Sequence, residues 1–338
     1  MRDQRAVNRL SADRWPRLGV AMIAVAAMAA VAAAPAAEAT FPGEPGSIAF
    51  TRLVDRQQGI DQIFSVDPAG GPPQQLTAFA SGAKQPEFSP DGSRIAFYRP
   101  RPNAVFAMGA DGSGPVRVTR GCRAPRCLGD QDPGWAPTGE LLFARPFGPV
   151  TADFAAEVDL MRVGADGSAL GVVRRFVKRQ DGREPINDAQ MSPDGRSIAV
   201  TLMDNRGRRK LETAIFVLDA DGGNLRRVTP TRVNAGNPDW SPDGERIVFN
   251  SSFEGQSAPE IYTVRPDGTD LHRVRREPRR SYSFEPVWSP DGTHIAMVHG
   301  TGDTVPKIWT MRSDGSDLRQ ITHGPRLDFR PDWGTRSQ

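Results

Sequence analysis

The sequence predicts an all-β protein, a six-bladed β-propeller of four-stranded antiparallel blades closed by pairing the C-terminal strand with the N-terminal three strands. A turn motif that reads Ser-Pro-Asp-Gly in its complete copies recurs along the chain. A repeat of about 40 to 50 residues with a turn motif in each copy is typical of propeller blades. The 34 Gly and 30 Pro, with few long apolar runs, indicate many short strands joined by tight turns.

Each copy of the motif begins with an aromatic residue or Met, and these positions set the repeat. They lie at residues 88, 135, 191, 240, 288 and 333, so the intervals are 47, 56, 49, 48 and 45 residues. The copies starting at 88, 191, 240 and 288 are complete, the copy at 135 is degenerate, and the last is truncated. Within a complete copy, Pro presets φ at the first corner, Asp bonds back to the backbone, and Gly takes a positive φ.

Four strands can be assigned to each copy, in order. The first carries the pattern x-Pro-x-Trp, as at 237–240, and its Pro is tolerated because the innermost strand of a blade lies at a sheet edge. The second and third are apolar runs such as 247–249 and 261–264. An Asp-Gly hairpin turn, as at 267–268, then leads to a short last strand.

The two ends of the chain supply complementary fragments of one blade. Residues 47–77 contain the second, third and fourth strands without a first, and residues 330–334 contain a first strand with nothing after it. The C-terminal strand is therefore predicted to pair with the N-terminal three. Such closure hides sheet edges that would otherwise invite aggregation.

The pattern Trp-Ser-Pro-Asp-Gly-x-x-Ile-Ala-Phe resembles the WD40-like repeats of the TolB C-terminal propeller family, over nearly all of residues 45–335. The resemblance implies the propeller fold and, more loosely, a periplasmic Tol–Pal partnership. This chain departs from the family in two ways. TolB carries an α/β domain before its propeller, whereas here the N-terminal segment leads almost directly into the first blade. The third copy also has a long insertion and Ala189 where the other copies have Pro.

The N-terminal region has the layout of a secretory signal peptide. Arg-rich residues 2–17 precede an apolar run at 18–34, and Ala37-Glu38-Ala39 forms a small-x-small cleavage site. We expect a signal peptide at 1–39, a short linker at 40–46 and the propeller at 47–335. The alternative is an uncleaved membrane anchor. Either way the protein is expected to be exported to the periplasm, the cell envelope or the medium.

Charge and cysteine content narrow the expected partners. Removing residues 1–39 lowers Lys+Arg from 43 to 38 and Asp+Glu from 40 to 37, so the mature chain is nearly neutral and general nucleic-acid binding is not indicated. Cys122 and Cys127 are predicted to form a short-range disulfide, as suits an exported protein. No cofactor and no metal are predicted, and we expect a monomer.

The strand order places short turns on one face of the propeller and long loops on the other. The long-loop face consists of the loops between second and third strands together with the loops between blades. Functional residues concentrate on variable loops held by a rigid scaffold. The basic side chains of the long-loop face suit a partner bearing carboxylate or phosphate groups, and the alternative is an ordinary solvated surface. The candidates are Arg123, Arg126, Arg179, Arg279 and Arg280.

A second candidate site lies at the predicted mouth of the central channel. It consists of the residues that precede the inner-strand Pro or its equivalent, namely Gln85, Asp132, Asp188, Asn237, Glu285 and Arg330. The three carboxylates among them could hold a cation or a polar ligand, and the alternative is rim polarity around trapped water. The aromatic and Met positions of the motif are predicted to pack between blades.

No catalytic motif is found, neither Gly-x-Ser-x-Gly, nor His-Glu-x-x-His, nor a phosphate-binding P-loop. His299 and His323 fall on the long-loop face and are expected to be surface residues. The leading hypothesis is a binding scaffold for an envelope protein, a peptide or an anionic polymer. The alternative is a polysaccharide-active hydrolase or lyase that uses the channel-mouth carboxylates as acid and base.

Overall fold

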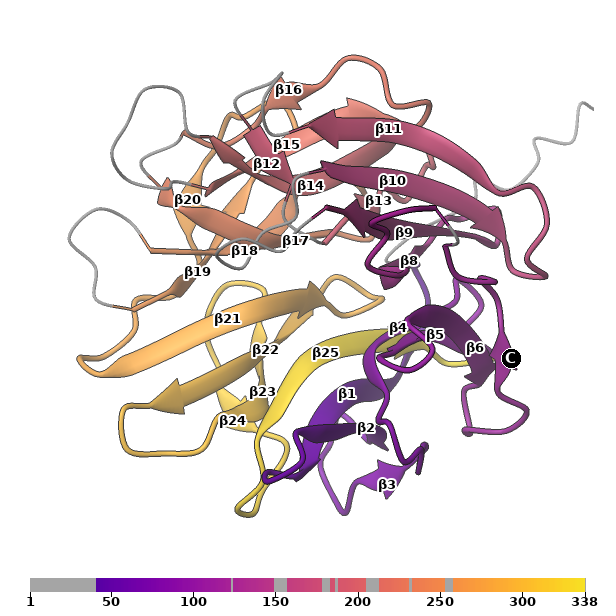
Figure 1. Cartoon of the computed structure of the whole chain (residues 1–338). Helices are drawn as coiled ribbons and strands as arrows, with labels where there is room; N and C mark the ends of the chain where they lie inside the picture. Colours follow the sequence, from indigo (N-terminus) through magenta and orange to yellow (C-terminus); the bar gives the residue numbers. More distant parts are fainter. Residues whose placement is uncertain are drawn as a thin grey trace, which may run out of the picture. The chain divides into compact units, whose positions relative to one another are not determined.

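The computed structural model describes residues 41–122, 124–148, 157–177, 183–185, 188–204, 213–230, 233–252 and 258–337. The predicted signal peptide, residues 1–39, lies outside this part of the chain. Among the described residues, no helix is long and apolar enough to cross a membrane. The described strands form six sheets that follow one another around a ring (Figure 1).

Each sheet is one blade, and its innermost strand comes first in the following list. Blade 1 contains β25 (Asp328–Thr335), β1 (Pro45–Asp55), β2 (Ile60–Val66) and β3 (Gln74–Gln75). Blade 2 contains β4 (Lys84–Phe88), β5 (Arg94–Arg99), β6 (Ala104–Gly109) and β7 (Val116–Arg117). Blade 3 contains β8 (Gln131–Trp135), β9 (Glu140–Phe147), β10 (Glu157–Gly164) and β11 (Gly171–Val177).

Blade 4 differs from the others because its innermost strand is split into two short pieces that both pair with the next strand. These are β12 (Arg183–Pro185) and β13 (Gln190–Met191), followed by β14 (Ser197–Asp204), β15 (Thr213–Asp219) and β16 (Arg226–Arg227). Blade 5 contains β17 (Ala235–Trp240), β18 (Ile247–Ser251), β19 (Glu260–Val264) and β20 (His272–Arg273). Blade 6 contains β21 (Ser281–Trp288), β22 (His294–Thr301), β23 (Lys307–Arg312) and β24 (Arg319–Gln320).

The predicted closure of the ring is confirmed. The strand order in blade 1 is β25-β1-β2-β3, so the C-terminal strand is the innermost strand of the N-terminal blade. In the antiparallel register of β1 and β25, Ile48 faces Trp333 and Ala49 faces Asp332. One blade is thus built from β25 and the N-terminal strands β1 to β3, and this pairing closes the six-bladed ring.

The Ser-Pro-Asp-Gly corners form as the sequence predicts. In blade 2, the Ser89 hydroxyl donates to Asp91 at 2.6 Å, and the backbone N–H of Arg94 donates to Ser89 Oγ at 2.9 Å. Gly92 has a φ of 66°. These bonds join the first and second strands of the blade in a fixed turn, and they recur in the other complete copies.

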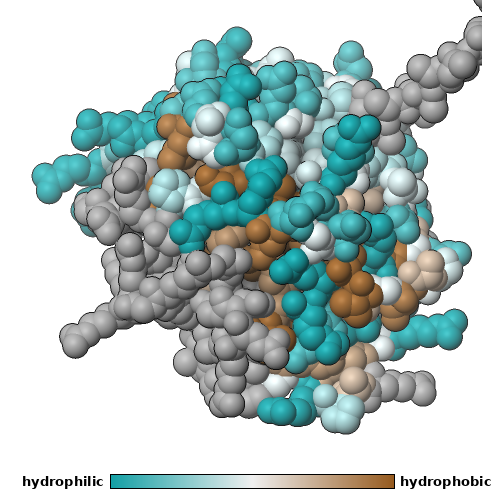
Figure 2. All heavy atoms as spheres, turned by 90° about the horizontal axis from the view of Figure 1, so that it is seen from above, coloured by the Kyte–Doolittle hydropathy of each residue, from teal (hydrophilic) through white to brown (hydrophobic). Residues whose placement is uncertain are grey.

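The core lies between neighbouring blades, as the motif residues predict. Trp240 of blade 5 is 2% exposed and packs with Ile215 and Val217 of blade 4. Its indole N–H donates to the backbone carbonyl of Gln190 in blade 4 at 3.0 Å. The outer surface seen in Figure 2 is mostly hydrophilic, with smaller apolar areas between polar side chains. Hydrophobic burial therefore holds blade to blade rather than creating a separate interior for each sheet.

The Asp-Gly turns have a second role that the hairpin pattern does not reveal. A Cβ added to Gly268 of blade 5 would lie 2.9 Å from the Val228 carbonyl oxygen of blade 4, and Gly167 makes the same approach to Val118 at 2.8 Å. Gly112, Gly222 and Gly315 each make the same close approach to a backbone carbonyl oxygen of the preceding blade. Gly70, in the corresponding turn of blade 1, has nothing within 4 Å. The seam between blades 6 and 1 therefore lacks a contact that the other blades have.

This difference predicts unequal effects of two alanine substitutions. Gly268 and Gly70 have φ values of 89° and 98°, so both variants carry the cost of a positive φ, about 1–2 kcal/mol. Gly268→Ala must also displace the Val228 carbonyl, which adds about 1–3 kcal/mol. Urea denaturation should show a larger loss of unfolding free energy for Gly268→Ala. Equal losses would contradict the packing role.

Candidate functional site

The six predicted channel-mouth residues share an uncommon backbone conformation. Each has a positive φ, between 50° and 92°, although none is Gly. Five of them precede Pro, a position that normally takes an extended conformation, and Asp188 precedes Ala189. In five blades the pairing register of the innermost strand slips at this residue, as between Lys84 and Glu87. Such a slip is a β-bulge, which re-aims side chains. The six residues line one cavity, so they meet as the repeat predicts, and their role in binding stays a prediction.

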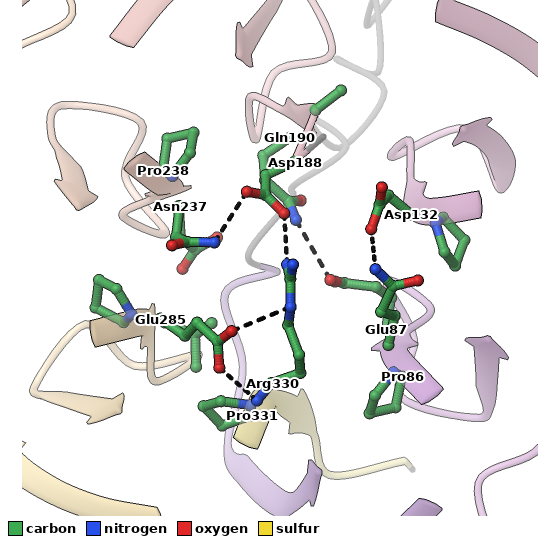
Figure 3. Close-up of a pocket in the computed structure, with 16 residues that line it drawn as sticks. Pro86, Glu87, Asp132, Asp188, Gln190, Asn237, Pro238, Glu285, Arg330 and Pro331 are labelled. Atoms are coloured by element: carbon green, nitrogen blue, oxygen red, sulfur yellow. Dashed lines mark hydrogen bonds and ion pairs between the residues drawn. The ribbon is translucent and has the colours of Figure 1, made fainter. Parts of the chain in front are cut away.

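Arg330 lies at the centre of this cavity and connects opposite sides of the ring (Figure 3). It extends from blade 1, and its Nη1 lies 2.5 Å from Asp188 Oδ1 on the blade 4 side. Its Nε lies 3.1 Å from Glu285 Oε1, and its backbone N–H donates to Glu285 Oε2 at 2.7 Å. Burial lowers the pKa of Arg330, but the charges of Asp188 and Glu285 outweigh it, so the pKa is raised above its ordinary value. The guanidinium therefore stays charged and neutralises two of the three mouth carboxylates.

Asp132 occupies the other sector of the mouth. Its Oδ1 accepts a hydrogen bond from the Gln85 amide, while its Oδ2 and the Gln85 amide oxygen are buried without a partner. Burial raises the pKa of Asp132 to about 7, against a smaller opposing effect of Arg330. The carboxyl group is thus partly protonated near neutral pH. Asn237 belongs to the first sector, where its amide donates to Asp188 at 2.9 Å.

A second layer of carboxyl groups lies two residues further along the innermost strands, deeper in the channel. It contains Glu87, Asp239 and Asp332, which also line a smaller cavity with Phe41. Asp239 accepts from the Trp288 backbone N–H at 2.7 Å, and Asp332 accepts from that of Phe88 at 2.5 Å. This layer was not among the residues predicted from the sequence, although the repeated pattern x-Pro-x places it beside the mouth.

Two of the deeper carboxyl groups, those of Glu87 and Asp332, hold protons more tightly than free ones. Desolvation raises the pKa of Glu87 well above its ordinary value, and the nearby charges of Asp332 and Asp239 raise it further. Burial raises the pKa of Asp332 to about 7. Glu87 is contacted by the Gln190 amide, which approaches its Oε1 at 3.4 Å. The channel is therefore acidic but partly protonated.

The predicted basic residues do not converge in the same way. Arg126 is exposed in the loop between blades 2 and 3, and Arg279 and Arg280 are exposed between blades 5 and 6, across the ring. Arg280 pairs with Asp303 at 3.1 Å, but both side chains are over 70% exposed, so the pair contributes little to stability. Arg123 and Arg179 lie outside the described residues. The three described arginines, Arg126, Arg279 and Arg280, therefore form separate basic spots rather than one patch.

The two cysteines are free thiols in the structure, and the predicted disulfide is not formed. The side chains are nevertheless in contact: burial, followed by a hydrogen bond with Cys122, raises the pKa of Cys127 to about 11. His299 differs from the expected surface residue, because it is 6% exposed and bonds Ser283 Oγ at 2.8 Å. His323 is exposed. Among the described residues, no group of His, Cys, Asp and Glu side chains is arranged to hold a metal.

The contact between the thiols predicts that mild oxidation closes the disulfide without unfolding the protein. The mass should fall by about 2 Da and both thiols should become unreactive. Because the thiolate is the attacking form and burial keeps Cys127 protonated, the reaction should accelerate with pH. Intact-mass spectrometry with a thiol label measures this, and Cys122→Ser is the control. Persistent labelling of both thiols after oxidation would contradict the pairing.

Residues 176–336 match a family model described as the TolB beta propeller domain. The Tol-Pal system protein TolB of Anaeromyxobacter dehalogenans is 28% identical over 268 residues, covering 68% of this chain and 59% of that protein. The TolB homolog of Chlorobium luteolum is 29% identical over 219 residues, covering 64% and 44%. Among solved structures, TolB from Acinetobacter baumannii gives a TM-score of 0.67 at 16% identity, covering 88% of this chain and 69% of that chain.

These similarities concern the propeller. The chain spans less than two thirds of the length of the curated relatives that it matches. At 16% identity, the likeness to the Acinetobacter structure shows the fold alone. The motif copies, the ring closed by β25 and the family match agree on one assignment. The described propeller of this chain is TolB-like.

Proposed function

We propose that this protein is an exported binding module that recognises an envelope protein, a peptide or an anionic polymer through its long-loop face. Export is supported by the Arg-rich and apolar N-terminal sequence and by relatives named as Tol-Pal system proteins. The channel mouth lies on the same side of the propeller as the long loops, because the innermost strands begin there. A partner docked on this face would therefore cover both the exposed arginines and the mouth.

The pairing of Arg330 with Asp188 and Glu285 carries this proposal. An acid–base pair needs one carboxyl group that gives up a proton and one that receives it, each free to reach a substrate. Here one guanidinium contacts both carboxylates and occupies the space between them. This arrangement disfavours the alternative of a polysaccharide hydrolase or lyase, whereas a binding module needs only a complementary surface.

The test is affinity capture from an envelope extract with the exported protein and two charge variants. Arg279→Ala/Arg280→Ala removes two exposed charges from the long-loop face and should reduce capture several-fold, most strongly at low salt. Arg312→Ala/Arg319→Ala is the matched control, because it removes two exposed arginines that flank an Asp-Gly turn on the opposite face. Equal capture by both variants would refute the role of the long-loop face.

A further inference from the structure

The channel mouth is asymmetric in how its charges are satisfied. Asp188 and Glu285 each contact Arg330, but Asp132 has one oxygen bonded to the Gln85 amide and one without a partner. Asp132 is 7% exposed, and the Gln85 amide oxygen beside it also lacks a donor. A buried acceptor without a donor costs about 1–3 kcal/mol, and more when it is charged. This sector of the mouth therefore leaves two buried acceptor oxygens without a donor among the described residues.

The free space limits what could supply these donors. The cavity at the mouth has a volume of about 50 Å³, and Asp132 points into it from blade 3 (Figure 3). A single water needs about 10–15 Å³ on the same scale, so the cavity admits one small group and not a sugar ring or a planar base.

The oxygen atoms of this sector also distinguish a metal ion from an amine as the ligand. Calcium takes about six to eight oxygen ligands, but this sector offers one carboxylate and one amide, since Arg330 engages the other two carboxylates. An ammonium group carries three N–H donors and one charge, which suits two adjacent acceptors of which one is ionised. The chemistry of the sector therefore fits a primary amine better than a metal.

We infer that the channel mouth is a receptor for one ammonium group of a bound polypeptide, a lysine side chain or an N-terminal amine, held by Asp132 and Gln85. The inference rests on the proposed function and narrows it, because it selects a polypeptide partner over an anionic polymer. Four charged or titratable side chains influence or adjoin Asp132: Lys84, Tyr98, Asp188 and Arg330. Because the pKa of Asp132 is about 7, the amine should bind more tightly at pH 8 than at pH 6.

The experiment follows amide resonances of the exported protein by NMR during titration with two tripeptides, acetyl-Gly-Lys-Gly-amide and its norleucine counterpart. The lysine peptide should bind near Asp132 and the norleucine peptide should bind at least tenfold more weakly. Asp132→Asn keeps the size of the side chain, and Asn tolerates a positive φ, so the fold should survive while the affinity falls at least tenfold. Asp303→Asn, on the same face, is the control and should change little.

Further probes distinguish the sources of the amine. Butylammonium that binds as tightly as the lysine peptide would assign the site to small amines and overturn the polypeptide part of the inference. Unchanged affinity in Asp132→Asn, or displacement of the peptide by calcium chloride at the same resonances, would overturn the site itself. This result is independent of the capture experiment, since peptide binding can persist when Arg279→Ala/Arg280→Ala leaves capture unchanged. In that case the proposed function fails and the amine site stands.

Discussion

Asp328→Asn should open the propeller at its seam and lower the free energy of unfolding by about 3–5 kcal/mol, the usual cost of breaking a buried ion pair. Asp328 on β25 is fully buried and receives two hydrogen bonds from Arg52 on β1, at 2.6 and 2.8 Å. Lys307 on β23 adds a third contact at 3.3 Å. These three side chains join the C-terminal strand to the N-terminal strand and to blade 6, where the turn contact of Gly70 is missing.

The chain contains a matched control for this substitution. Arg145 and Asp130 form the same kind of buried pair in blade 3, at 2.6 and 3.1 Å, with equal exposure of the two side chains. Asp130→Asn should therefore cost a similar free energy but leave the ring closed. Hydrogen exchange separates the two variants: Asp328→Asn should speed exchange throughout β1 and β25, and Asp130→Asn only around its own pair. Protected β1 and β25 amides in Asp328→Asn would show that the seam does not depend on this cluster.

Sequence reasoning predicted the ring and its closure because they follow from local patterns. A turn motif marks its own residues, and a missing first strand at one end points to the extra strand at the other. The Arg52–Asp328 pair could not be predicted in this way, because its partners are 276 positions apart and neither belongs to the motif. Only the observed pairing of β1 with β25 brings them together.

In the channel, too, the repeat predicts which residues meet, whereas their contacts are seen only in the structure. The repeat predicted that six residues would meet at the mouth, and they do. It could not predict that Arg330 would cross from blade 1 to Asp188 beside blade 4, since that depends on the bulges and on the width of the channel. The deeper layer, by contrast, could have been predicted from the sequence. Glu87 and Asp332 are one strand repeat from the mouth residues, so the same period of two places them in the channel.

Because the channel is acidic, we expect Glu87→Gln to raise the free energy of unfolding at pH 8 by about 1–3 kcal/mol. This is the usual cost of leaving a charged group in a poorly hydrated site. The pKa of Glu87 in the folded protein is raised well above the value expected when unfolded. The folded state therefore binds more protons than the unfolded state between these two pKa values. The contribution of Glu87 to the free energy of unfolding is therefore fully present below the pKa of Glu87 in the unfolded state. It is lost as the pH rises through the pKa of Glu87 in the folded state. Asp132 and Asp332, with pKa values of about 7, act in the same direction, so unfolding free energy should fall between about pH 4 and pH 8.

Replacing the carboxyl group by an amide removes the charge and keeps a donor and an acceptor beside Gln190. The gain should therefore be large at pH 8, disappear near pH 4, and flatten the pH dependence of urea denaturation midpoints. Asp291→Asn is the control of opposite sign. Burial raises the pKa of Asp291, but hydrogen bonds from Ser289 and Thr293 outweigh it, so the net pKa is lowered. At pH 8, the free energy of unfolding of Asp291→Asn should be lower by less than about 1 kcal/mol, since the turn is partly exposed. If Glu87→Gln is less stable than the native protein at pH 8, the Glu87 carboxylate must have a compensating partner. The channel would then hold less uncompensated negative charge than the side-chain positions indicate.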